Sequence, residues 1–107
     1  MILITGPMWS GKRETAVKLL GLDAARCVFD AQELAFCCGD LPELADRLAQ
    51  YDAVTIAEVG GGIVPLDPEE RVRRERAGRL ACLLAERAEA VVRVFCGIPK
   101  VIKGELP

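Results

Sequence analysis

Short apolar runs alternate with segments of helical periodicity along the chain. The runs are typical of buried strands, and they span residues 1–5, 26–30, 53–57 and 90–96. Apolar residues recur every three or four positions, as in amphipathic helices, over residues 13–20, 40–49 and 67–88. Residues 31–36 suit one or two helical turns, and residues 100–103 a short last strand after a turn at 97–99. Strands that alternate with helices predict an α/β fold with a mostly parallel sheet flanked by helices.

Capping residues support two of the predicted helices. Asp40, followed by Pro42 and Glu43, and Asp67, followed by Pro68, have the form of helix starts. The long helix after Asp67 is expected to run to about residue 88, with arginines and glutamates interleaved on a solvated face. Its apolar stripe is expected at Val72, Leu80, Leu83 and Leu84.

A glycine loop at residues 6–12 fits G-x-x-x-x-G-K directly after the first predicted strand and before a helix. Backbone N–H groups of such a loop converge on phosphate oxygens, and its lysine reaches the outer phosphates. The simpler alternative is a glycine-rich turn with a surface lysine. The favoured interpretation is a phosphate site, and its candidate nucleotide-binding residues are Gly6, Pro7, Met8, Trp9, Ser10, Gly11, Lys12 and Arg13.

Two residues of the loop region leave questions open. Arg13 stands where a Ser or Thr would supply a hydroxyl to Mg²⁺. Binding of ATP or GTP is therefore expected, whereas a role for Mg²⁺ and turnover of the nucleotide stay open. Trp9 is the single tryptophan; packing against the protein is the favoured interpretation over covering a base or ribose.

Acidic residues follow two predicted strands, and carboxyl ends of parallel strands line the ligand crevice of open sheets. Asp30 ends the second strand and Glu58 follows the third. With Lys12 they form the predicted catalytic set, in which a carboxylate activates a hydroxyl or holds Mg²⁺ through water. Three glycines come next, as suits a tight turn or a backbone close to a ligand, and the predicted substrate loop is Gly60, Gly61 and Gly62.

Composition narrows the class of protein. The 107 residues suit one domain, residues 1–107, and the 51% hydrophobic share points to a homo-oligomer. A net charge of −2, from 14 basic and 16 acidic residues, gives no support for a nucleic-acid or membrane partner. With no signal peptide and no apolar stretch of membrane-spanning length, a cytoplasmic location is expected. The chain has no histidine, so none serves in catalysis or metal binding.

Five cysteines do not form a disulfide pattern, because their number is odd and no C-x-x-C occurs. Cys27 and Cys96 lie in apolar runs and are expected to be small buried residues. For the adjacent Cys37 and Cys38, two reduced thiols without a role are favoured over a redox pair.

Residues 58–65 read E-V-G-G-G-I-V-P and are similar to the E-V-G-x-G-I-V-P signature of the adenosylcobinamide kinase/adenosylcobinamide-phosphate guanylyltransferase family, enzymes of cobalamin assembly. The opening I-L-I-T-G with the following S-G-K resembles the family's phosphate loop. Further similar positions are Arg74, Glu75, Ala77, Gly78 and Arg79 in the long helix, and Gly97, Ile98, Pro99 and Lys103 at the end.

This resemblance implies a small P-loop NTPase-like (RecA-like) fold and transfer of the γ-phosphoryl group of ATP or GTP to a corrinoid hydroxyl. It also implies trimers. The chain is shorter than family members around residues 31–51, where the family carries the histidine that it guanylylates; without histidine, guanylyl transfer by that mechanism is excluded. Two alternatives stay open: a non-catalytic nucleotide- or corrinoid-binding paralogue with a regulatory or assembly role, and a structural paralogue that associates with a full-length member.

Overall fold

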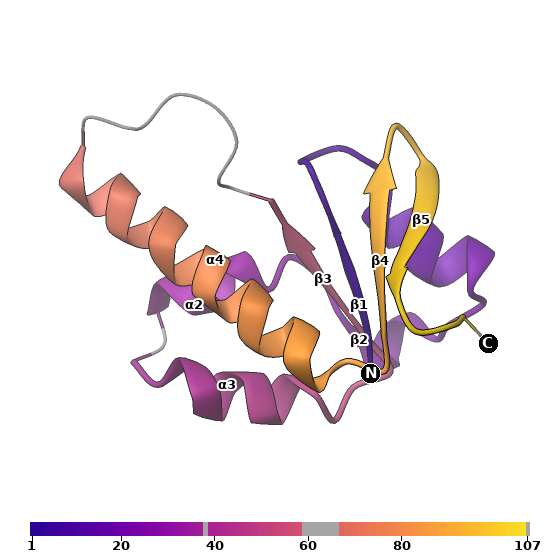
Figure 1. Cartoon of the computed structure of the whole chain (residues 1–107), viewed down its shortest axis with the longest axis horizontal. Coiled ribbons are helices and arrows are strands. Elements are labelled where there is room, and N and C mark those ends of the chain that lie inside the picture. The colour runs from indigo at the N-terminus through magenta and orange to yellow at the C-terminus, as the bar shows by residue number, and fades with distance from the viewer. Residues whose placement is uncertain (38, 59–66, 107) are drawn as a thin grey trace.

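A five-stranded sheet forms the centre of the molecule, with strand order β2-β3-β1-β4-β5 (Figure 1). The computed structural model describes residues 1–37, 39–58 and 67–106. Central β1 (Ile2–Gly6) runs parallel to β3 (Ala53–Ala57) and to β4 (Ala90–Phe95). Short β2 (Cys27–Val28) is parallel to β3, and β5 (Ile98–Lys103) is antiparallel to β4. The predicted α/β fold with a mostly parallel sheet is confirmed.

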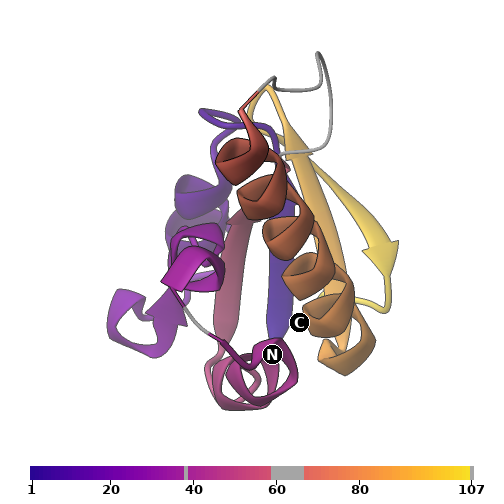
Figure 2. The same cartoon turned by 90° about the vertical axis from the view of Figure 1, so that its left-hand side faces the viewer.

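Helices cover both faces of this sheet, as Figures 1 and 2 show. On one face lie α2 (Gln32–Cys37), α3 (Leu41–Leu48) and the long α4 (Pro68–Arg87). On the other face lies α1 (Lys12–Glu14), which continues as the π-helix η1 (Thr15–Leu19). The single turn of 3₁₀-helix η2 (Ala24–Arg26) precedes β2. Among the residues described, no helix is both long enough and apolar enough to cross a membrane.

Both predicted capping residues form hydrogen bonds at the starts of their helices. The Asp40 side chain accepts a hydrogen bond from the Glu43 amide, and the Asp67 side chain accepts one from the Glu69 amide, each at 3.0 Å. These bonds satisfy amides that have no partner inside the helix. The starts of α3 and α4 are therefore confirmed as predicted.

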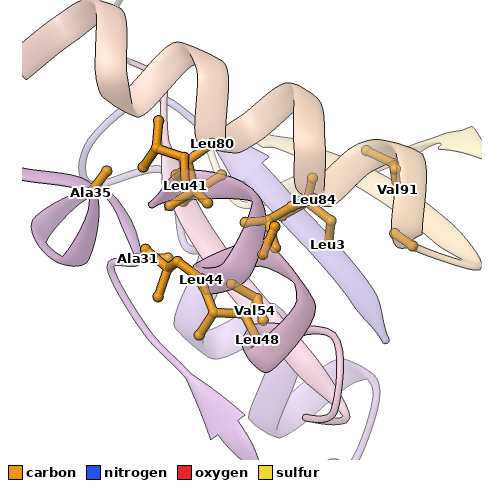
Figure 3. Close-up of a cluster of buried hydrophobic side chains, with 13 residues drawn as sticks. Leu3, Ala31, Ala35, Leu41, Leu44, Leu48, Val54, Leu80, Leu84 and Val91 are labelled. Carbon is orange, nitrogen blue, oxygen red and sulfur yellow. The ribbon is translucent and has the colours of Figure 1, made fainter. Parts of the chain in front are cut away.

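The larger core lies between the sheet and the layer of α2, α3 and α4 (Figure 3). Its buried members are Leu3, Ala31, Ala35, Leu41, Leu44, Ala45, Leu48, Val54, Ile56, Leu80, Leu84, Ala88 and Val91. Within α4, the burial of Leu80 and Leu84 is confirmed, and Leu83 packs at the margin.

Val72, by contrast, is 54% exposed, so its predicted place in the core is wrong. With 20 residues α4 is about 30 Å long, whereas the five-residue β1 spans about 17 Å. Figure 1 shows that α4 is inclined to the strands, so that its first turns lie away from the sheet.

A smaller core lies on the opposite face of the sheet, where Ala16 of η1 packs against the strands. Its buried strand residues are Ile2, Ile4, Cys27, Ala53, Ala90, Val92 and Val94. The expected burial of Cys27 is confirmed. Fewer residues cover this face, because the π-helix η1 is short and α2, α3 and α4 all lie on the other side.

Three local expectations are wrong. Strand β2 ends at Val28 and not at Asp30, because the Asp30 amide donates to the Thr55 hydroxyl at 2.9 Å and its φ is +58°. The last turn consists of Cys96 and Gly97, both with positive φ, as primed hairpin turns require. Cys96 is consequently exposed, and Ile98 and Pro99 belong to β5.

Of the Cys37–Cys38 pair, Cys37 is exposed and Cys38 lies outside the described residues.

Candidate functional site

The glycine loop (residues 6–12) connects the carboxyl end of β1 to α1, as predicted. Gly6 has φ +156°, and a Cβ there would collide with the Val94 carbonyl oxygen. Gly11 has φ +93°, and a Cβ there would lie 3.3 Å from the Gly97 Cα atom. The Gly97 amide also donates to the Ser10 carbonyl at 2.8 Å. Contact with the Val94 carbonyl therefore requires glycine at position 6, and the positive φ beside a tight contact with the β4–β5 turn favours glycine at position 11.

The Lys12 side chain turns back into the loop and is only 7% exposed. Its Nζ donates to the Pro7 carbonyl at 2.7 Å and contacts the Ser10 hydroxyl at 3.5 Å. Burial lowers the pKa of Lys12, and the negative charges of Asp30, Glu58 and Glu14 oppose that shift in turn. The alternative interpretation as a surface lysine is therefore wrong.

A cavity of about 210 Å³ opens beside the loop. It is lined by Trp9, Ser10, Gly11, Lys12, Arg13, Glu14, Phe29, Asp30 and Thr55. The Arg13 guanidinium lies 4.5 Å from the centre of the Phe29 ring, within the range of a cation–π contact. Arg13 is thereby held at the cavity, where its positive charge joins that of Lys12.

Trp9 does not pack against the protein, contrary to expectation. Its side chain is 94% exposed and its φ is +63°. The neighbouring Met8 is also exposed. Both residues lie in the loop that follows β1, at the carboxyl end of that strand.

The predicted catalytic residues Lys12, Asp30 and Glu58 lie at the same end of the sheet. Asp30 lines the cavity together with Lys12. The Glu58 amide donates to the Gly6 carbonyl at 2.8 Å, which ties the end of β3 to the loop. Both carboxylates act on the Lys12 pKa. The predicted substrate loop, Gly60, Gly61 and Gly62, lies outside the described residues.

Arg93 is the residue that the sequence interpretation missed. Its guanidinium makes a two-pronged ion pair with the Glu58 carboxylate, at 2.7 and 3.0 Å. This hydrogen bonding lowers the pKa of Glu58 and raises that of Arg93. The available signal was a single charged residue within the apolar run of β4.

This arrangement can bind an anion at its two cationic side chains, and two carboxylates, Asp30 and Glu14, line the same cavity. Lys12 and Arg13 bring cationic donors to the cavity, and Asp30 offers a carboxylate there that could accept a proton. For a metal ion, the described part of the chain contains no group of three or more His, Cys, Asp and Glu side chains. In comparisons with known proteins, no protein-family model matches this chain and no curated protein shows a significant sequence match.

Proposed function

We propose that the chain is a P-loop nucleotide-binding protein whose glycine loop binds the phosphates of ATP or GTP. The observation that carries this proposal is the buried Lys12 ammonium. Within the described residues it donates to two neutral oxygens and forms no ion pair with a carboxylate. Burial costs the ammonium hydration energy, which these two hydrogen bonds and the more distant carboxylates repay only in part, because the pKa of Lys12 is still lowered. A bound phosphate would supply the missing negative charge.

The position of the loop gives further support. It follows the central strand of a mostly parallel sheet, and the neighbouring strand β3 ends beside it. Ligands of open α/β sheets bind at the carboxyl ends of the strands. We therefore assign the chain to the P-loop NTPase-like (RecA-like) proteins as part of the same proposal.

The reaction proposed for this site is phosphoryl transfer to an acceptor hydroxyl. The bond from the γ-phosphorus to its bridging oxygen breaks, and the electron pair leaves with the nucleoside diphosphate. The γ-phosphorus bonds to the acceptor oxygen, whose proton passes to a carboxylate. Asp30 suits that role better than Glu58, because Asp30 lines the cavity whereas Arg93 already binds both oxygens of Glu58. The acceptor, a corrinoid hydroxyl, is proposed from the resemblance of residues 58–65.

The donor atoms at the loop fit Mg²⁺ poorly. Arg13 provides a guanidinium in place of the hydroxyl, and Arg13 and Phe29 hold each other at the cavity. A fixed positive charge repels a divalent cation and attracts phosphate. No step is therefore assigned to a metal. The same observation favours the second candidate, a nucleotide-binding paralogue that does not turn its ligand over. Association of copies of the chain stays a proposal, supported by exposed apolar residues on edge strand β5.

Arg13→Ser tests the role given to Arg13. Calorimetric titrations with ATP and GTP, with and without Mg²⁺, would be compared for the native protein and the variant. Native binding should depend little on Mg²⁺, because Arg13 supplies positive charge. Without Mg²⁺ the variant should bind nucleotide more weakly than the native protein does. Addition of Mg²⁺ should strengthen nucleotide binding by the variant. Lys18→Ser, which removes an exposed charge from η1, is the matched control.

Phosphoryl transfer to a corrinoid would be followed in the same samples. Transfer by the native protein supports the kinase, and nucleotide binding without transfer supports the non-catalytic paralogue. Equal Mg²⁺ dependence in both proteins would refute the role given to Arg13. Failure of the native protein to bind any nucleotide would refute the proposed function.

A further inference from the structure

The cavity beside the glycine loop is too small for a whole nucleotide. Its volume is about 210 Å³, whereas pockets that enclose a drug-sized ligand measure roughly 300–1,000 Å³. Lys12 and Arg13 place the positive charge of the lining at the loop. If phosphates occupy this space, the nucleoside must lie outside it, against the rim.

Trp9 is the aromatic surface that the rim offers. Its indole is almost fully exposed, on a residue whose φ is positive. The other aromatic residue of the lining, Phe29, is half-buried and already carries the Arg13 guanidinium on its ring. Trp9 contributes nothing to either buried core, so folding does not explain its place in the loop.

We propose that Trp9 stacks on the base of the bound nucleotide and that the site does not distinguish between bases. This inference rests on the proposed phosphate site. Stacking on an aromatic side chain tolerates any base, because every base has a π-face. Discrimination would need hydrogen-bonding groups along the base edge. The loop neighbours of Trp9 do not supply them: Pro7 and Met8 have no polar N–H or oxygen in the side chain, and Ser10 is buried.

Calorimetric titration with ATP, GTP, CTP and inorganic tripolyphosphate tests the proposal. We expect the three nucleotides to bind within about threefold of one another, and about tenfold more tightly than tripolyphosphate, in the range of one stacked base. Tripolyphosphate carries more negative charge than the nucleotides, so charge alone would favour tripolyphosphate. Tighter binding of the nucleotides must therefore come from the nucleoside. As the single tryptophan, Trp9 should also lose fluorescence when a nucleotide binds.

Variants of Trp9 test whether this residue accounts for the tighter binding of nucleotides. Trp9→Ala should reduce nucleotide affinity to that of tripolyphosphate and leave tripolyphosphate binding unchanged. Alanine keeps a Cβ atom, so the positive φ is no more strained than before. Trp9→Phe should retain part of the difference. The matched control is Leu19→Ala, which truncates an exposed apolar side chain of η1 outside the loop and should change nothing.

Several results would overturn the proposal. Equal affinity for nucleotides and tripolyphosphate would show that phosphates bind and Trp9 does not, and would leave the proposed function intact. A preference of more than about tenfold for one base would contradict stacking alone. Emission that changes with protein concentration in the absence of ligand would place a second copy of the chain on Trp9. If neither tripolyphosphate nor any nucleotide binds, the phosphate site itself is refuted.

Discussion

The core beneath α4 and the glycine loop differ in the kinds of side chain that they bury. Leu3, Leu80 and Leu84 are almost wholly enclosed by other apolar side chains (Figure 3). In the loop an ammonium is buried and an indole is exposed, at Lys12 and Trp9. The first arrangement follows the usual preference of side chains, and the second reverses it. Departures from that preference are expected at functional sites, which sacrifice local stability for binding.

The buried polar side chains show the same division. Within the described chain they are Ser10, Lys12, Thr15, Gln32 and Thr55. The first three lie in the loop or just after it, and Thr55 lines the cavity. Gln32 accepts a hydrogen bond from the amide of Ala57, the last residue of β3. Buried polarity is thus concentrated at the loop end of the sheet, where a ligand would bind.

Leu84→Ala is expected to have the largest effect, on stability alone. Loss of a fully buried leucine should lower the free energy of unfolding by about 2–5 kcal/mol. Urea unfolding measures this change, with Val72→Ala in the exposed part of α4 as control. Nucleotide affinity of the folded variant should stay unchanged. A large loss of affinity in Leu84→Ala would show that the two regions are not independent.

Lys12→Ala should change nucleotide affinity more than stability, in contrast to Leu84→Ala. It removes a buried charged contact to a phosphate worth about 1.5–3 kcal/mol, so affinity for ATP or GTP should fall about tenfold or more. Stability should fall much less than in Leu84→Ala, because burial already disfavours the charged lysine. Calorimetry and urea unfolding measure the two quantities, with Lys18→Ala as control. Unchanged affinity would refute the phosphate site.

The smallest effect is expected at the Glu58–Arg93 pair, whose side chains are 34% and 45% exposed. Because the pKa of Glu58 is lowered in the folded state, the pair adds stability above the usual pKa of 4.5 and loses it as pH falls through the lowered value. Arg93→Gln should therefore be less stable than the native protein at pH 7, and the difference should shrink on acidification. Urea unfolding at several pH values measures it. A difference that is constant with pH would contradict this account.

Prediction from sequence succeeded where the pattern is local. Apolar runs and caps located β1, β3, α3 and α4, and the G-x-x-x-x-G-K spacing located the loop between β1 and α1. It failed where a neighbouring element decides the outcome. Arg93 forms an ion pair with Glu58, which is 35 positions away in the sequence. Val72 is exposed because the first turns of α4 lie away from the sheet.

By itself, then, the sequence determined the type of most elements, the α/β class and the glycine spacing of the loop, because hydrophobic periodicity and backbone freedom act within a few residues. Only the tertiary structure decided that Lys12 is buried while Trp9 is exposed, since burial depends on which elements pack nearby. It also decided that β5 returns antiparallel, because Cys96 and Gly97 both take positive φ in the preceding turn. The candidate site depends on both levels: its residues come from local motifs, and their environment comes from strands distant in sequence.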